Sequence, residues 1–350
     1  MSRKLLTLSL ATTLMGGTAH ADTPQVAVDI APVHSLVARV MDGVGKPDLI
    51  VQPGASPHEY SLRPSEAAAL QNADLVFWIG QDLTPWLTQT IETLAPDAAV
   101  TALLETDGTI ELEFREGALF GAHDHNDHGT EDDQEDHAEE GHKAEDHDNH
   151  TKDGHEDHAK KEAGHDEHRE DEASHEGHDH GAHDPHAWLS PKNAMTWLNV
   201  IAGQLSAADP ENAGAYFANA TAGRTEIEAL IGEITATLDP VRDGQFIVFH
   251  DAYQYFELDF DFPASGAISI SDASDPSPAR IAEIQNRIAE QGIDCVLAEP
   301  QFNASLVATV LDGTEAKTGI LDPLGSDLEP GPALYPQLIR NLSTALAGCM

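Results

Sequence analysis

Short apolar runs alternate with segments of helical periodicity over the first hundred residues of the chain. Three runs have the length and composition of buried strands: residues 26–30, 48–51 and 73–80. Three further segments carry apolar residues at helical spacing: 32–41, 63–71 and 84–94. Strands and helices that alternate in this way predict an α/β fold with a mainly parallel sheet.

The same alternation returns over the last hundred residues. Strands are predicted at 245–250, 266–270, 295–300 and 317–322. Helices are predicted at 251–256, 278–291, 304–311 and 335–347. We therefore expect a second α/β lobe, again with a mainly parallel sheet.

Two helical patterns lie between these regions. The first covers residues 189–205; the second follows Asp209, a suitable N-cap with Pro210 at the first helical position, and keeps one apolar stripe until Pro240. A helix of that length suits a strut between two lobes. The expected division is an N-terminal lobe over 22–205, a linking helix over 206–239 and a C-terminal lobe over 240–350.

The N-terminus has the pattern of a secretory signal peptide. Arg3 and Lys4 precede an apolar run over residues 5–15, and Ala19 and Ala21 form an A-x-A cleavage site. The run is too short for a permanent membrane anchor. An N-terminal core helix would not account for the basic start and the cleavage site together. We expect residues 1–21 to be removed and the mature protein to be exported.

Residues 121–185, the acidic tract, interrupt the N-terminal lobe. The tract holds 24 acidic residues against five basic ones, and fifteen of the twenty histidines. Such a segment cannot build a core and is expected to be a flexible loop that binds metal ions as an accessory site. Its histidines are His123, His125, His128, His137, His142, His147, His150, His155, His158, His165, His168, His175, His178, His180 and His183.

Charge and cysteine content narrow the class of protein. A formal net charge of −43 excludes nucleic acid and anionic membrane surfaces as partners and favours cations. The two cysteines, Cys295 and Cys349, are expected to form a disulfide in an oxidising compartment. A buried free cysteine or a thiolate metal site remains an alternative, although the wide spacing makes a poor zinc motif.

Three histidines outside the tract lie next to predicted strands or helices rather than in repetitive sequence. His58 follows a strand, His186 stands where the tract meets the next helix, and His250 ends a strand, as Asp322 does. In open α/β sheets, ligands bind at the carboxyl ends of the strands. Three imidazoles and one carboxylate would make a tetrahedral zinc site. The alternative is that each histidine caps a helix or pairs with a buried amide.

Other polar residues are placed beside these candidates rather than among the ligands. Asp184 could hold the second ring nitrogen of His186 and fix its tautomer. Glu59 neighbours His58, and Glu299 ends a strand and could line the crevice. His34 has no companion ligand at helical spacing, so we expect it to be a structural or surface residue.

Several blocks of the chain resemble the zinc-specific solute-binding proteins of bacterial ABC importers, the ZnuA-like group. The blocks are GASPHEYSLRPSEAAALQNADLVFWIG, DPHAWLSP, FHDAYQYFE, and EPQF followed by LDPLG. The resemblance implies two lobes joined by one rigid helix, with zinc between them. It also implies that residues 295 and 349 pair as a disulfide.

The same resemblance implies a set of metal ligands. The three family histidines fall on His58, His186 and His250. Related manganese receptors generally carry a carboxylate at the third position, so a histidine there favours zinc. Some zinc members supply a fourth ligand from a glutamate where Pro57 stands here. Asp322 or a water molecule is then left to complete the shell.

The function implied is capture of Zn²⁺ in the periplasm and delivery to an ABC permease and its ATPase in the inner membrane, without catalysis. The protein is expected to be a monomer that could also exchange zinc with other periplasmic proteins. Three alternatives remain open: a manganese receptor of the same fold, a periplasmic zinc buffer that uses the acidic tract as its main site, and a zinc hydrolase in which Glu299 is the base.

Overall fold

The computed structural model describes residues 23–115, 120, 183–269, 276–302 and 304–350. The predicted signal peptide and the tract histidines from His123 to His180 lie outside the described residues. The elements described below belong to one compact unit, which excludes residues 122–179. Within the described part, no helix is long and apolar enough to cross a membrane.

The N-terminal sheet has four parallel strands in the order β2-β1-β3-β4. Its strands are β1 (Val26–Val28), β2 (Asp48–Leu49), β3 (Leu75–Trp78) and β4 (Ala99–Ala102). The helices that connect them are α1 (Ala31–Val40), α2 (Pro64–Asn72) and α3 (Pro85–Leu94). The central strands β1 and β3 are buried along their whole length, which is typical of a parallel sheet covered by helices.

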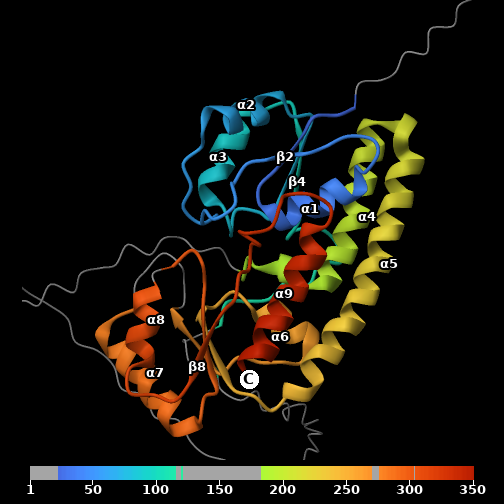
Figure 1. Ribbon diagram of the computed structural model, residues 1–350. Helices are drawn as coiled ribbons and strands as arrows, with labels where there is room; N and C mark the ends of the chain where they lie inside the picture. The colour runs from blue at the N-terminus through green and yellow to red at the C-terminus, as the bar shows by residue number, and fades with distance from the viewer. Residues whose placement is uncertain (1–22, 116–119, 121–182, 270–275, 303) are drawn as a thin grey trace, which may run out of the picture. The chain divides into compact units, whose positions relative to one another are not determined.

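The C-terminal sheet repeats this design with the order β6-β5-β7-β8, again all parallel. Its strands are β5 (Phe246–His250), β6 (Gly266–Ser269), β7 (Cys295–Ala298) and β8 (Lys317–Ile320). The helices that accompany them are α6 (Gln254–Phe260), α7 (Pro278–Gln291) and α8 (Ala304–Leu311). Figure 1 shows α7 and α8 beside β8 of this sheet. The α/β prediction with two parallel sheets is confirmed.

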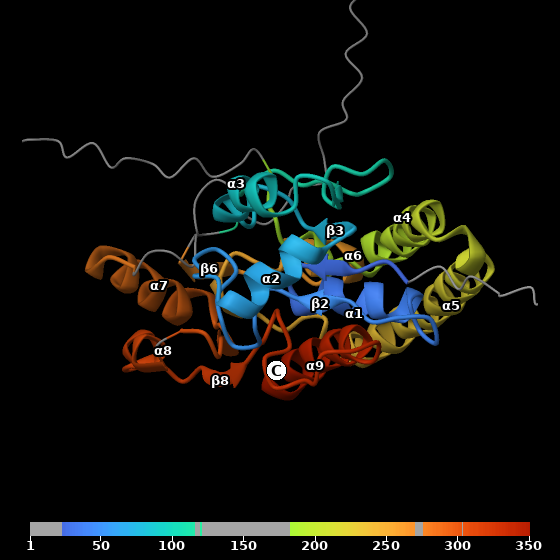
Figure 2. The same cartoon turned by 90° about the horizontal axis from the view of Figure 1, so that it is seen from above.

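Three long helices pack beside the sheets: α4 (Pro191–Ala208), α5 (Ala213–Leu238) and α9 (Leu334–Cys349). The long helix α5 contacts α1, α4 and α9, and Figures 1 and 2 show it running beside α4. Its buried residues recur at helical spacing from Tyr216 to Leu238. At Gly223 the approach is close, because an added Cβ would lie 3.0 Å from Leu198. The predicted long helix is present, preceded by a 3₁₀ turn over Pro210–Asn212. The predicted lobe boundaries stay a prediction.

The predicted disulfide is present between Cys295 at the start of β7 and Cys349 at the end of α9, with a Cα–Cα distance of 5.8 Å. It fastens the last helix to the C-terminal sheet. One apolar cluster continues from Val28 of β1 through α4, α5 and α9 to Val248 of β5. The two sheets and the long helices therefore share a core.

Some predicted boundaries are wrong. The helix expected at 251–256 is α6, which begins only at Gln254, because the chain turns after β5 with the Ala252 N–H donating to the His250 carbonyl. Strand β4 was not predicted, since its sequence AVTA is short and half exposed. The turn after β5 matters because it holds the last residue of the strand at the sheet edge.

Candidate metal centre

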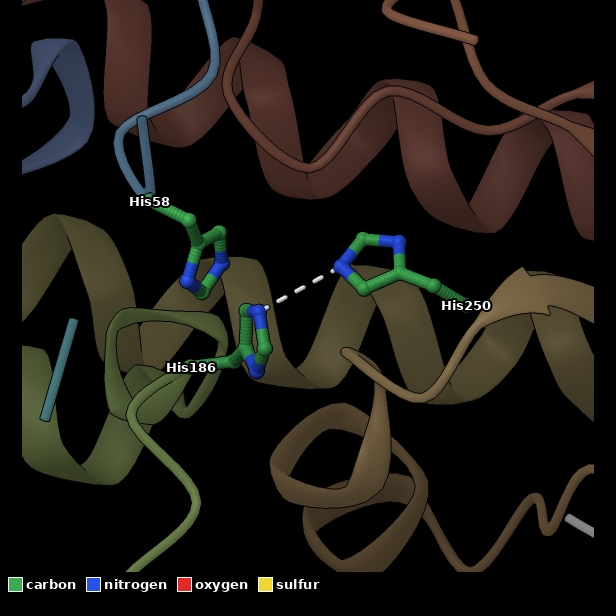
Figure 3. Close-up of side chains that lie close together, drawn as sticks. All are labelled: His58, His186 and His250. Carbon is green, nitrogen blue, oxygen red and sulfur yellow. Dashed lines mark hydrogen bonds between the residues drawn. The ribbon is translucent and has the colours of Figure 1, made fainter. Parts of the chain in front are cut away.

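Three histidines from distant parts of the chain converge on one point. His58 lies in the loop between β2 and α2, His186 directly precedes the 3₁₀ turn η1 (Ala187–Leu189), and His250 is the last residue of β5. One ring nitrogen from each lies within 4.8 Å of the others. Figure 3 shows the three rings around the same space, with His186 between the other two. The structure thus brings together the three histidines predicted from the sequence.

The ring geometry matches the spacing of zinc ligands. The Nε2 atoms of His186 and His250 are 3.3 Å apart, and the ring centroids of His58 and His186 are 5.5 Å apart. Zn–N bonds of about 2.0–2.1 Å in a tetrahedral shell also place two donor atoms about 3.3 Å apart. The His186–His250 pair thus has the spacing of two zinc ligands, and the donor nitrogen of His58 lies within 4.8 Å of both.

Two buried carboxylates orient two of the rings. The Nδ1 of His186 lies 2.7 Å from Asp184 Oδ1, and the Nδ1 of His250 lies 2.7 Å from Glu299 Oε1. An Nδ1–H that donates to a carboxylate leaves Nε2 with its lone pair toward the centre, as metal-bound histidines commonly have it. Both of the second ring nitrogens therefore point into the three-histidine group.

Burial makes these carboxylates sensitive to the charge at the centre. Burial raises the pKa of Asp184 to about 7, while the His186 N–H and the charges of Arg115 and His250 act in the opposite direction. Burial also raises the pKa of Glu299, again opposed by His250. A cation held by the rings would favour the ionised form of both carboxylates.

The space beside the histidines is small. A pocket of about 20 Å³, enough for roughly one water molecule, is lined by the three rings together with Trp188, Phe302 and other side chains. His186 and His250 are 5% and 4% exposed, whereas His58 is only half buried. The group can therefore hold a single ion and no organic ligand of ordinary size.

Asp322 is outside this group in the structure. Its carboxylate accepts the backbone N–H groups of Leu324 and Gly325, both at 3.0 Å, and of Ser326 at 2.6 Å. These bonds shape a loop whose Pro323 carbonyl accepts the Trp188 indole N–H at 2.8 Å. Pro323 and Leu324 line the pocket. Asp322 thus builds the pocket wall, and its predicted role as a ligand stays a prediction.

The other predicted residues separate into two kinds. Asp184 and Glu299 contact the histidines as described, whereas the side chain of Glu59 is exposed. His34 is buried and its Nε2 lies 3.1 Å from the Pro47 carbonyl, so it belongs to the structural scaffold. Of the tract histidines, His183 is described, and its side chain lies beside Asp82 and Glu111.

Arg115 was missed by the sequence reasoning. Its guanidinium contacts Asp251, the residue after His250, and donates to Glu257 Oε2 at 2.7 Å. It also lies 3.6 Å from the ring centroid of Phe120. The two carboxylate partners are at least 136 residues away along the chain, so no local pattern could have indicated these ion pairs. Arg115 fixes the turn that carries His250.

These features define a metal-binding receptor: two parallel α/β sheets on a helical scaffold, with three imidazoles gathered from separate segments. The chain belongs to the family described as "Zinc-uptake complex component A periplasmic", whose model matches residues 26–349. The resemblance predicted from the sequence blocks is therefore confirmed.

Relatives and solved structures agree with this placement. The "High-affinity zinc uptake system protein ZnuA" of Brucella abortus (strain 2308) is 45% identical over 96% of this chain and 94% of its own length. The protein of the same name from Paracoccus denitrificans is 40% identical over 95% and 93%.

Among solved structures, "Crystal structure of ZnuA" matches with a TM-score of 0.67 at 20% identity, covering 93% of this chain and 99% of that one. The manganese complex of FpvC from Pseudomonas aeruginosa matches with a TM-score of 0.68 at 18% identity, covering 93% and 98%. At 18–20% sequence identity, these two structures show only that the fold is shared.

Proposed function

We propose that this chain captures Zn²⁺ with high affinity in the periplasm and delivers it to an ABC permease and its ATPase in the inner membrane. The observation that carries the proposal is the group of three histidines whose ring nitrogens lie within 4.8 Å of one another. Membership in the zinc-uptake family and the names of the relatives support it. His58, His186 and His250 are the proposed ligands.

The donor set favours zinc over manganese. Neutral imidazole nitrogens suit zinc, whereas manganese is best served by carboxylate, carbonyl and water oxygens. His250 supplies a nitrogen where related manganese receptors carry a carboxylate. Since FpvC, which was solved in complex with Mn²⁺, shares the fold, selectivity has to come from the donors and not from the architecture.

The fourth position is proposed to be water. Asp322 already accepts three backbone N–H groups, and each such bond to a charged acceptor contributes about 1.5–3 kcal/mol, which favours its staying in the loop.

A receptor role also fits the state of the two carboxylates. Glu299 Oε1 accepts both the ring N–H and the backbone N–H of His250, which suits a carboxylate that orients a ligand. We propose that the protein is not an enzyme, that residues 1–21 are a signal peptide and that the mature chain is a monomer.

The proposed lobes 22–205 and 240–350 contribute different ligands, so docking on the permease can loosen the site by separating them.

Zinc titration of three forms of the mature protein tests the proposal. The forms are the full chain, a chain lacking residues 122–179, and a chain carrying His58→Ala and His250→Ala. We expect the deletion to keep one tight site and to lose several weaker ones, and the double variant to lose the tight site. Manganese should not compete at equal concentration. If the deletion abolishes tight binding while the double variant keeps it, the acidic tract is the main site and the protein is a buffer.

A further inference from the structure

Two aromatic rings stand against the histidines of the metal centre. The ring centroid of Trp188 lies 5.2 Å from that of His186, and the ring centroid of Phe302 lies 5.5 Å from that of His250. Both aromatic side chains line the pocket beside the histidines. A phenyl ring has no atom that ligates a metal ion, and an indole N–H only donates. Part of the wall around the centre therefore offers no ligand.

Both rings are held in place. The Trp188 indole N–H donates to the Pro323 carbonyl at 2.8 Å, and the residue is 1% exposed. The Phe302 ring stacks on Phe249, with centroids 4.3 Å apart and an angle of 10° between the planes. Phe249 in turn belongs to a buried apolar cluster that includes Val307. Swinging Phe302 outward would break this stack and expose apolar surface to water.

The space between these walls limits how many waters can join the ion. An octahedral ion held by three imidazoles needs three waters, whereas a tetrahedral ion needs only one. Each water needs at least about 10–15 Å³ of cavity, so three waters need at least about 30–45 Å³. The pocket has about 20 Å³. It therefore suits the tetrahedral shell of zinc better than the octahedral shell that manganese favours.

We propose that Phe302 is a specificity-determining residue of the metal centre. Its ring, together with that of Trp188, keeps further waters from the ion and holds the ion at four ligands. Ions that favour six ligands then lose affinity relative to zinc, so the number of donors selects the metal as well as their kind. The inference rests on the proposed function, because it takes the three histidines as the ligands.

The ordinary alternative is that Phe302 only covers the apolar cluster beneath it. The ring is half buried and stacks on Phe249, so packing alone would account for a phenyl ring at this position. The two cases differ in what removal of the ring does. Loss of packing lowers stability and leaves the bound ion at four ligands, whereas loss of the wall admits water and raises the number of ligands.

Cobalt substitution separates the two cases, because Co²⁺ with four ligands absorbs visible light several-fold more strongly than Co²⁺ with six. One equivalent of Co²⁺ is bound to the mature protein and to three variants: Phe302→Ala, Phe302→Leu and Val307→Ala. Phe302 lies outside the helices and strands and is half buried, so its truncation should leave the fold intact. We expect intense visible absorption from the parent and a several-fold loss of that absorption in Phe302→Ala.

The other two variants are the controls. Phe302→Leu keeps an apolar wall, so it should retain the intense absorption. Val307→Ala loosens the same apolar cluster without changing a side chain that lines the pocket, so it should retain the absorption as well.

Competition between zinc and manganese gives a second readout. The ratio of the manganese to the zinc dissociation constant should fall about tenfold or more in Phe302→Ala, which is the scale on which apolar pocket contacts discriminate between ligands. The ratio should be unchanged in Phe302→Leu and Val307→Ala.

The inference is overturned if Phe302→Ala keeps both the spectrum and the ratio of the parent, or if Val307→Ala changes them as much as Phe302→Ala does. It is also overturned if the parent itself gives the weak spectrum of a six-coordinate ion. The proposed function fails by a different result, equally tight Co²⁺ binding by the parent and by a chain carrying His58→Ala and His250→Ala, and the inference would fall with it.

Discussion

Replacing Glu299 by glutamine should lower zinc affinity without destabilising the metal-free protein. The carboxylate accepts the ring N–H of His250 at 2.7 Å and the backbone N–H at 3.3 Å. Glutamine keeps the shape and one acceptor oxygen but removes the negative charge that strengthens the ring as a donor. Loss of such a partner typically weakens metal binding by about 10–100-fold, which corresponds to about 1.4–2.7 kcal/mol.

The stability of the metal-free form should move in the opposite direction. Burial raises the folded-state pKa of Glu299 above its unfolded value, so ionisation at neutral pH costs folding free energy. The protonated carboxyl of Glu299 therefore favours the folded state at low pH, and this stabilisation is lost as the pH rises through the folded-state pKa. The glutamine variant cannot ionise, so it should be at least as stable as the parent at neutral pH.

The assay is a competition titration against a zinc chelator at pH 7.5, with urea unfolding of the metal-free proteins in parallel. Glu59→Gln is the matched control, because Glu59 is exposed beside His58, and it should leave the affinity unchanged. Equal affinities for the parent and Glu299→Gln would refute the reasoning. A loss of affinity that tracks an equal loss of stability would also refute it, since it would indicate general damage.

Three further outcomes follow from the structure. Asp322→Asn should still bind one zinc ion at the three histidines, with reduced affinity because the loop that forms the pocket wall loosens. If titration shows that this site is lost, Asp322 is a ligand. Replacing Cys295 and Cys349 by serine should lower the free energy of unfolding by about 4 kcal/mol with zinc stoichiometry unchanged; an unaltered urea midpoint contradicts this. Arg115→Met should cost about 3–5 kcal/mol at pH 7.5 and less at pH 5, because its unpaired carboxylate partners can then bind protons; a loss independent of pH speaks against charge burial.

The sequence predicts most elements where local signals agree. Helix α7 matches its predicted bounds, because Ser277 accepts the Arg280 N–H as an N-cap, Pro278 follows it, and Gly292 takes a left-handed conformation at the end. Strand β4 escaped prediction because its four residues, of which only Thr101 is buried, carry no periodic apolar signal.

The prediction of the site used one residue type, histidine, and one topological rule, that ligands bind at the carboxyl ends of parallel strands. His250 at a strand end, His58 in the loop after a strand and His186 before a helix were expected to converge, and their ring nitrogens lie within 4.8 Å of one another. That Glu299 reaches His250 follows from the register of β5 and β7, in which Phe246 stands opposite Cys295, so residues four further along also meet. Asp322 prefers the backbone amides of its own loop, and spacing along the chain cannot reveal such a choice.

Anomalous diffraction at the zinc edge, from crystals of the mature protein loaded with one equivalent of zinc, tests the central claim most directly. The account predicts one dominant peak about 2.0–2.1 Å from a ring nitrogen of each of His58, His186 and His250. A dominant peak at any other place in the protein, with none among these three rings, would contradict it.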